Sequence, residues 1–342
     1  MSAAPWICGA IALGLALLLT PLVRRACVVL RIYDFPGPLK IHSQPIPRLG
    51  GIAIAVALAT AVSAWTGRSN LPLWPFLIAL GFTWATGLLD DLRGLSPSVR
   101  IVAQLAGASL LWHSGWRIPL AGNGIFSLVG TCLFVIVFVN AFNFLDGADG
   151  IAGGVAAIIA LGYALLPVDA LSGVGAAIAW TLVGVSCGFL AFNFPPAKLF
   201  MGDSGSTALG LGVAFLGLDF FRAGAATASQ LPFPILVAAL PLVDATLAVL
   251  RRLLGRVSPF YGDRRHFYDL LLARGSSVRA IALICYALTG ALVIAASLAR
   301  RAGFPLALIF LGLSVGALFT AAVKLGALRT RDENPGAEEV RT

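Results

Sequence analysis

Long apolar segments recur along the chain and are separated by short polar ones. Each segment is long enough, or nearly so, to cross about 30 Å of hydrocarbon as an α-helix. The segments lie near residues 6–24, 49–66, 71–89, 99–113, 123–143, 151–167, 171–192, 205–221, 231–250, 278–298 and 303–323. The pattern predicts an all-α, polytopic integral membrane protein with about eleven transmembrane helices.

The composition supports this interpretation. Of the 342 residues, 59% are hydrophobic and only 11% are charged, with a mean hydropathy of +0.93, whereas about a quarter of the residues in soluble domains are charged. The first segment lacks a basic region before it and a small-residue cleavage site after it, which favours a retained helix over a signal peptide. We therefore expect residues 1–325 to form a single transmembrane domain and residues 326–342 a disordered tail.

The distribution of positive charge predicts the orientation. All but five of the 24 Lys and Arg fall in the loops after the odd-numbered segments, in the turns that flank them or in the tail. The exceptions are Arg68, Arg117, Arg222, Arg300 and Arg301. Because cytoplasmic loops carry the excess of Lys and Arg, the N-terminus should lie outside and the C-terminus in the cytoplasm. The net charge of +9 reflects this bias and attraction to anionic lipid, and no nucleic-acid motif accompanies it.

Aspartates gather in the same loops as the cations. They are Asp34, Asp90, Asp91, Asp146, Asp149, Asp203, Asp263 and Asp269. Charged groups at the edge of the hydrocarbon are costly unless they are satisfied, so convergence on one polar site explains them better than scattered placement. Short Asp side chains suit a site that holds a hard cation close to phosphate oxygens.

The stretch NAFNFLDGADG follows the fifth apolar segment. Asn140, Asn143, Asp146 and Asp149 recur every three residues and are expected to lie on one face. The motif DGADG is superficially similar to a calcium loop, but the twelfth position counted from Asp146 is Ala157 instead of Glu, which argues against an EF-hand.

Two other loops place carboxylates at the ends of apolar segments. Asp90 and Asp91 end the third segment, where paired carboxylates either hold a metal ion or act as a base. Asp203 begins the eighth segment among small residues that allow the backbone to approach a ligand closely. The sequence GDSG around Asp203 is not accompanied by a pattern that supplies the His and Asp of a serine hydrolase.

Basic residues follow the ninth segment and precede the second. Arg264, Arg265 and His266 form a cluster suited to a diphosphate. Lys40 lies in a loop rich in Pro and Gly, DFPGPLKIHSQPIPRLGG, which alone is equally well interpreted as a rigid positive-inside loop.

Together, DD, NxxNxxDGxDG, PAKxFMGDxGS and a late DRxH, spread over residues 34–275, resemble the polyprenyl-phosphate N-acetylhexosamine-1-phosphate transferases. The resemblance implies a catalytic domain in the bacterial cytoplasmic membrane, with an active site built from cytoplasmic loops. It implies transfer of a sugar 1-phosphate from a UDP-sugar to polyprenyl (undecaprenyl) phosphate, with release of UMP. It also implies Mg²⁺ as cofactor, with Mn²⁺ as an alternative ion.

The resemblance also assigns roles to individual residues. It implies metal coordination by Asp203, with Asn143 as a second candidate ligand. The candidate catalytic or lipid-phosphate residues are Asp90, Asp91 and His266, and the candidate substrate-binding residues are Lys40, Asn140, Asp146, Asp149, Arg264 and Arg265. The implied partners are the UDP-sugar, the polyprenyl phosphate and membrane lipids, with no nucleic acid, and a homodimer is left open.

Two departures from the family pattern indicate the branch. The form DDxxD often has a third acid, but Gly94 occupies that position here. The late motif commonly has two or three histidines, whereas DRRHFYDLL keeps only His266. This favours the branch that initiates lipopolysaccharide O-antigen, teichoic-acid or other cell-wall glycans over the muramoyl-pentapeptide branch.

A transporter or lipid flippase is the alternative interpretation. Such proteins place ionisable groups near the middle of the bilayer, and the acid that lies deepest in a predicted segment here is Asp244. The chemistry of the polyprenyl phosphate acceptor favours a transferase that works in one step. A phosphate monoester has a second pKa of about 6 and is already largely dianionic at neutral pH.

Overall fold

The computed structural model describes residues 5–37, 40–64, 72–120, 124–224, 228–260 and 262–328. In chain order the described elements are α1 (Trp6–Val29), β1 (Tyr33–Asp34), β2 (Ile46–Pro47), α2 (Gly51–Ser63), α3 (Trp74–Arg93), α4 (Pro97–His113), α5 (Ile125–Leu145), α6 (Ile151–Ala164), α7 (Gly173–Asn193), α8 (Gly202–Ala223), α9 (Pro232–Val237), α10 (Ala239–Leu254), α11 (Phe267–Leu272), α12 (Val278–Ala302) and α13 (Phe304–Lys324). Short 3₁₀ turns cover Val168–Ala170 and Ala228–Gln230. The predicted tail beyond residue 328 lies outside the described residues.

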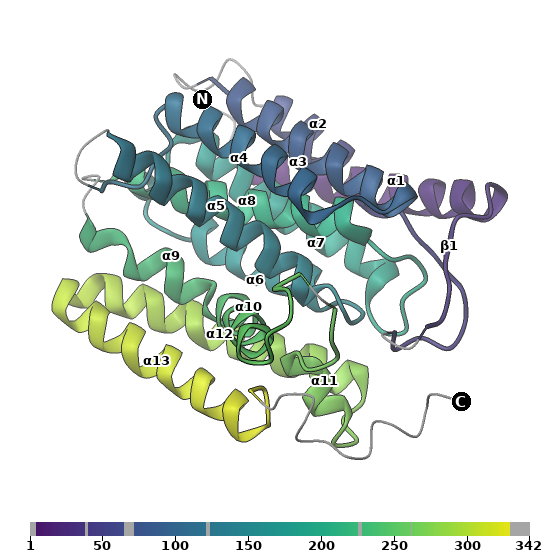
Figure 1. Ribbon diagram of the computed structural model, residues 1–342. Helices are drawn as coiled ribbons and strands as arrows, with labels where there is room; N and C mark the ends of the chain where they lie inside the picture. The colour runs from purple at the N-terminus through teal and green to yellow at the C-terminus, as the bar shows by residue number, and fades with distance from the viewer. Residues whose placement is uncertain are drawn as a thin grey trace.

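Each apolar segment predicted from the sequence contains helix, but the ninth segment is divided. The prediction of one helix over 231–250 is wrong, because the chain forms α9 and α10 with a break at Ala238. Pro241 explains the break, since it has no N–H and its ring clashes with the carbonyl of Val237, four residues earlier. Figure 1 shows α10 nearly end-on while the neighbouring helices run across the view, and α10 packs against α5 and α13.

Six of the described helices are long and apolar enough to cross a membrane, namely α1, α5, α7, α8, α12 and α13. The protein is therefore an integral membrane protein that is mostly helical. The helices α2 and α6 are apolar but shorter, and α3 ends in charged residues. The count of about eleven spans and the orientation stay predictions.

Helix α8 forms the centre of the bundle and is buried along almost its whole length. It contacts α2, α3, α5, α6 and α7. Glycine allows two of these contacts to be unusually close. A Cβ added at Gly87 of α3 would lie 2.7 Å from the Cα of Ser204, and one added at Gly210 of α8 would lie 2.8 Å from the Cα of Val139. Helices that pack through such small residues bring their backbones together.

One end of the bundle is held by a buried polar cluster. Asp219 of α8 is fully buried and accepts hydrogen bonds from Trp116 Nε1 at 2.9 Å and from the backbone N–H of Ser172 at 2.8 Å. Arg222 lies over the Trp116 ring at 4.7 Å and donates to the carbonyl of Ser114. These contacts connect α8 to the segment after α4 and to the start of α7.

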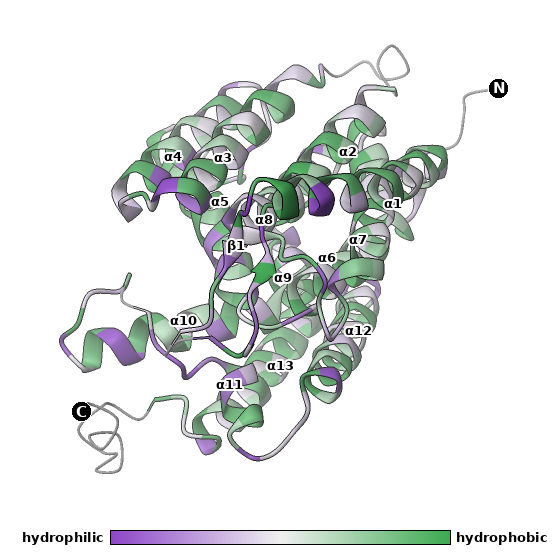
Figure 2. Cartoon of the chain, turned by 90° about the vertical axis from the view of Figure 1, so that its right-hand side faces the viewer, coloured by the Kyte–Doolittle hydropathy of each residue, from purple (hydrophilic) through white to green (hydrophobic). Residues whose placement is uncertain are grey.

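The opposite end carries most of the other polar residues. The antiparallel pair β1–β2 and the short helix α11 both lie there (Figure 1). Viewed toward this end, polar segments of the loops converge over the ends of α3, α5 and α8 (Figure 2). The fold therefore brings loops that are far apart in the sequence to one face.

Candidate active site

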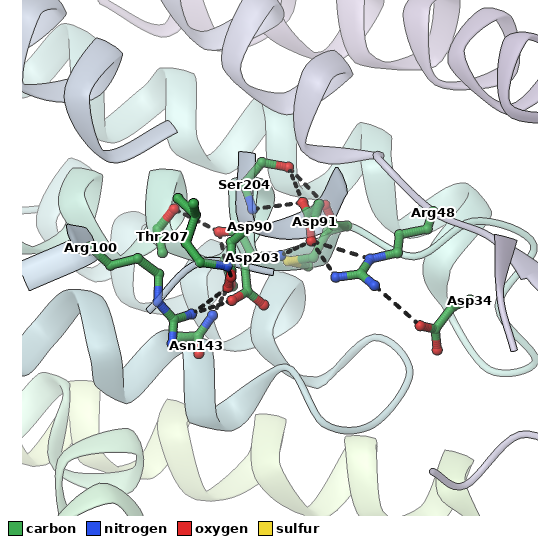
Figure 3. A network of polar contacts seen from close by, with 12 residues as sticks. Asp34, Arg48, Asp90, Asp91, Arg100, Asn143, Asp203, Ser204 and Thr207 are labelled. Carbon is green, nitrogen blue, oxygen red and sulfur yellow. Dashed lines mark hydrogen bonds and ion pairs between the residues drawn. The ribbon is translucent and has the colours of Figure 1, made fainter. Parts of the chain in front are cut away.

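Three helix ends meet at the polar face of the molecule. Asp90 and Asp91 end α3, Asn143 lies in the last turn of α5, and Asp203 lies in the first turn of α8 (Figure 3). The close packing of α3 and α5 on α8 brings these ends together. The sequence prediction that carboxylates from separate loops converge is borne out for these helix ends.

Asp91 is fully engaged by the protein. Its carboxylate, whose side chain has no exposed surface, accepts from the backbone N–H groups of Asp203 at 2.9 Å and Ser204 at 3.1 Å, and from the Ser204 hydroxyl at 2.7 Å. Arg48 Nη2 donates to the same carboxylate at 2.8 Å. Gly202 precedes this turn with φ +69°, and a Cβ there would collide with Asp91. Asp91 thus fixes the start of α8 and orients Asp203.

Asp90 and Asp203 share one cation. Arg100 Nη1, from the first turn of α4, donates to Asp90 Oδ2 at 2.8 Å and also to the carboxylate of Asp203. The backbone N–H of Leu95 donates to the other oxygen of Asp90. The side chains of both acids and of Arg100 keep partial exposure. In the sequence, Arg100 was interpreted only as evidence of orientation. Its position at the start of a segment, on the same side as the acids, could have indicated a site residue.

The two asparagines of the fifth segment have different partners. Asn143 Nδ2 donates to Ser206 Oγ at 3.1 Å, which leaves its Oδ1 without a donor among the described residues. Asn140 Nδ2 donates to Gln104 Oε1 at 2.8 Å and so connects α5 to α4. Asn143 therefore presents an oxygen next to Asp203, whereas Asn140 supports the packing one turn deeper.

Asp146 and Asp149 also separate in the structure. No described residue donates a hydrogen bond to the Asp146 carboxylate. Burial, and the carboxylates of Asp203, Asp91 and Asp149, raise the pKa of Asp146 well above its ordinary value. Asp149 Oδ2 instead accepts from the backbone N–H of Ala197 at 2.9 Å and holds the segment before α8. The four positions predicted to share one face thus divide between the acid cluster and its supports.

The loop between α1 and α2 is folded around Asp34. This carboxylate accepts from Lys40 Nζ at 2.7 Å and lies 2.8 Å from His42 Nε2 and 3.4 Å from Arg48 Nη1. Arg48 therefore bridges Asp34 and Asp91, a role that the sequence did not reveal. Lys40 keeps a 38% exposed side chain at the rim of the site, where it can meet a ligand.

His266 is buried against the end of α5. Its Nδ1 lies 2.7 Å from Asp244 Oδ2, and the backbone N–H of Phe267 donates to the other oxygen of Asp244 at 2.7 Å. Burial alone would lower the pKa of His266, but the carboxylate of Asp244, followed by those of Asp263 and Asp269, raises it above its ordinary value. The ring contacts Phe144 of α5 at 5.6 Å. Asp244, the deepest acid of its segment, is thus the partner of His266.

The arginines around His266 fix this region in place. Arg251 and Arg252 both bind Asp263, Arg251 with two nitrogens at 2.8 and 2.9 Å, and these contacts lower the pKa of Asp263 despite its partial burial. Arg252 also lies over the Phe144 ring at 5.0 Å. Arg264 donates to the carbonyl of Lys40 at 3.2 Å, so the region closes onto the loop between α1 and α2. Arg265, the other arginine of the predicted substrate-binding cluster, accepts a hydrogen bond at its backbone carbonyl from Arg251.

The oxygen atoms that fit a hard cation lie between α3, α5 and α8. They belong to Asp90, Asp203 and Asn143. The described residues contain no group of three or more His, Cys, Asp or Glu arranged as a complete metal site. An ion with few protein ligands that takes the rest from phosphate and water, as Mg²⁺ does, fits this donor set.

Comparison with known proteins identifies the family of the chain. Residues 73–220 match the model of glycosyl transferase family 4. A probable undecaprenyl-phosphate N-acetylglucosaminyl 1-phosphate transferase of Bacillus subtilis is 31% identical over 79% of this chain and 78% of its own length. A decaprenyl-phosphate N-acetylglucosaminephosphotransferase of Mycolicibacterium smegmatis is 33% identical over 77% and 74%. A phospho-N-acetylmuramoyl-pentapeptide-transferase of Moorella thermoacetica is more distant, with 28% identity over 66% and 76%.

These relatives confirm the resemblance, and the chain is more similar to the N-acetylglucosamine-1-phosphate transferases than to the muramoyl-pentapeptide transferase. The chain belongs to the polyprenyl-phosphate N-acetylhexosamine-1-phosphate transferase family and is a phosphosugar transferase of the glycan-initiating branch.

Proposed function

We propose that the protein transfers N-acetylhexosamine 1-phosphate from a UDP-sugar to polyprenyl phosphate in the bacterial cytoplasmic membrane, with Mg²⁺ bound and the site facing the cytoplasm. The observation that carries the proposal is the position of Arg100 between Asp90 and Asp203. Oxygen donors for a hard cation lie beside a guanidinium that can bind phosphate. The names of the relatives favour N-acetylglucosamine as the sugar.

The ion would be held by Asp203, Asp90 and the free oxygen of Asn143. A hard cation held there would supply charge neutralisation for the two phosphates that must approach each other. Arg48 is held by Asp34 and Asp91 and adds fixed positive charge at the edge of the site. These groups suit a reaction whose main requirement is alignment and charge neutralisation.

The lipid acceptor reaches this site from the bilayer. Figure 2 shows α10 apart from α3 and α4 in a view toward the polar end of the molecule. The final turns of α10 carry exposed leucines, Leu250, Leu253 and Leu254. We place the isoprenoid chain against this helix, with its phosphate at the acids and arginines of the site.

The chemistry needs no covalent enzyme intermediate. An oxygen of the dianionic acceptor attacks the β-phosphorus of the donor, a new P–O bond forms, and the bond from that phosphorus to the α-phosphate oxygen breaks to release UMP. Asp91 is an unsuitable nucleophile, because both of its oxygens already accept hydrogen bonds. Asp90 is held by Arg100 and the N–H of Leu95. These hydrogen bonds favour positioning roles for Asp90 and Asp91 over a role as nucleophile.

A first experiment follows UMP release by purified protein freed of endogenous lipid. UMP should form from UDP-N-acetylglucosamine only when polyprenyl phosphate and Mg²⁺ are both present, and a panel of UDP-sugars, including 6-deoxy N-acetyl sugars, ranks the donors. Labelled UMP should not exchange into the donor when the acceptor is absent. Exchange without lipid that disappears in Asp90→Asn or Asp91→Asn would replace this scheme with a covalent one.

Transport of a lipid-linked substrate is the alternative function, and the same purified protein can be used to test it. Asp244, the acid that lies deepest in a predicted segment, is paired with His266 and is thereby accounted for as a structural partner. Movement of polyprenyl-linked substrate across vesicles without UMP formation would favour the transporter.

A further inference from the structure

Two grooves lined largely by apolar residues lie at the end of the molecule away from the candidate site and share Arg300 as a lining residue. The α6–α12 groove, of about 270 Å³, has walls from the end of α6 and from α12, including Gly162, Val293 and Leu298. The α9–α12 groove, of about 190 Å³, lies between α9, α12 and α13 and includes Phe233 and Phe304. In Figure 1 this is the end at which α12 turns back into α13, beside α9.

Arg300 lines both grooves, and Arg301 lines the first. Both side chains are exposed, and no described carboxylate pairs with either of them. Neither acid of this end pairs with these arginines: Asp219 is buried with Trp116, and Asp169, close in sequence to the α6–α12 groove, is exposed without an ion pair among the described residues. Arg300 thus faces both grooves and Arg301 faces one of them, and neither has a carboxylate partner among the described residues.

Two adjacent arginines are unusual at this position in the chain. Arg300 and Arg301 are two of the five cations that fall outside the positively charged side, where Lys and Arg are depleted. They end α12, one of the helices long and apolar enough to span the membrane, so they lie at the level of lipid headgroups. Guanidinium groups bind phosphate through paired hydrogen bonds.

We propose that this end of the protein binds an anionic phospholipid from the leaflet opposite the candidate site. The headgroup phosphate lies between Arg300 and Arg301, and the two acyl chains run along the two grooves. Apolar walls exclude a free inorganic phosphate as the matching ligand, because it would leave both grooves unfilled. The proposal is independent of the reaction assigned above.

The bound lipid has a structural consequence for the rest of α12. At the other end of this helix, Tyr286 donates to the carbonyl of Gly150 at 2.7 Å and Arg279 donates to the carbonyl of Pro195 at 2.7 Å. Gly150 and Pro195 flank Asp149 and the segment before α8. A lipid that joins α6, α12 and α13 therefore steadies a helix that supports the loops of the candidate site.

The test measures lipid binding by the purified full chain. Phosphatidylglycerol, phosphatidylcholine and inorganic phosphate are each added to protein in detergent, and thermal unfolding and lipid retention by native mass spectrometry are recorded. Phosphatidylglycerol should raise Tm and be retained, whereas the other two should not. Replacing each arginine should weaken retention about fivefold, as expected for one cation at an anionic headgroup.

Three variants make the result specific. Arg300→Ala combined with Arg301→Ala should unfold at the wild-type Tm without lipid and lose the response to phosphatidylglycerol. Ser297→Phe, which fills the α6–α12 groove while keeping both arginines, should also weaken retention. Arg117→Ala, a change at another exceptional cation, should respond like the wild type. Equal responses in all variants, or equal stabilisation by phosphatidylcholine or inorganic phosphate, would overturn the proposal.

Discussion

Asp90 of α3 and Asp203 of α8 are 113 positions apart in the sequence and are joined by the same guanidinium nitrogen of Arg100. Two carboxylates this close repel each other unless a cation lies between them. In the proposed reaction that place belongs to a divalent ion, so Arg100 and the ion compete for the same oxygens. Arg100 is then free to contact phosphate when the ion binds.

This competition predicts opposite effects on metal binding and turnover. Arg100→Ala should bind Mn²⁺ more tightly than the wild type, because the carboxylates lose their internal counter-ion, while kcat falls about 100-fold through the lost phosphate contact. Mn²⁺ affinity is measured by electron paramagnetic resonance. Arg93→Ala, in the last turn of α3 with an exposed side chain, serves as the control. Weaker Mn²⁺ binding in Arg100→Ala would show that the arginine supports the ion rather than competing with it.

Asp91 and Asp203 should respond differently to mutation although both are close to the proposed ion. Asp91→Ala leaves two backbone N–H groups without their acceptor and removes one of the two carboxylates that hold Arg48, and should cost about 3 kcal/mol of stability or more. Asp203→Asn should keep the wild-type Tm, because Arg100 retains Asp90, but lose turnover and Mn²⁺ affinity together. Thermal unfolding and metal titration of both variants check this contrast. A normal Tm in Asp91→Ala would contradict the positioning role.

The pair formed by His266 and Asp244 predicts a pH dependence of stability. The pKa of His266 is raised in the folded protein above its ordinary value of 6.5. The stabilisation from protonated His266 is therefore fully present below that ordinary value and is lost as the pH rises through the raised, folded-state pKa. Asp244→Asn removes the main partner charge, so its Tm should fall less over this range. Parallel Tm profiles of the two proteins would refute this assignment.

The proposed orientation can be checked with single cysteines. In a background without the five natural cysteines, cysteine at position 40 or 264 should react with an impermeant maleimide only from the cytoplasmic side, because the cation bias places these loops inside. Cysteine at position 301 should react only from outside. Reaction of 40 and 301 from the same side would exclude the predicted topology, and a permeant reagent confirms that each cysteine is reactive.

Local sequence was sufficient for the helices. Uninterrupted apolar runs predicted helix in every segment, because a chain in lipid must satisfy its backbone hydrogen bonds within the segment. The same apolar pattern predicted one helix where the structure has α9 and α10, although Pro241 lies within that segment. A proline in a membrane helix is often tolerated, and whether the chain kinks or breaks there depends on the neighbouring helices.

The residues that approach Asp203 were decided by the tertiary structure. Sequence reasoning found Asp90, Asp91, Asn143 and Asp146 as polar groups at segment ends, and the fold brings them together at the start of α8. It missed Arg48 and Arg100, because a cation in a cytoplasmic loop is already explained by membrane orientation. One carboxylate partner of each lies far away in the sequence, since Asp91 is 43 positions from Arg48 and Asp203 is 103 positions from Arg100.

By itself, the sequence determined a helical membrane protein, its family and the set of polar residues from which a site could be built, since hydropathy and motif spacing are local properties. Only the tertiary structure separated Asp91, which holds the start of α8, from Asp90, which shares Arg100 with Asp203. Adjacent residues on a helix point about 100° apart, and which one meets α8 depends on the close approach at Gly87. That approach is a property of two packed helices and is encoded in neither one alone.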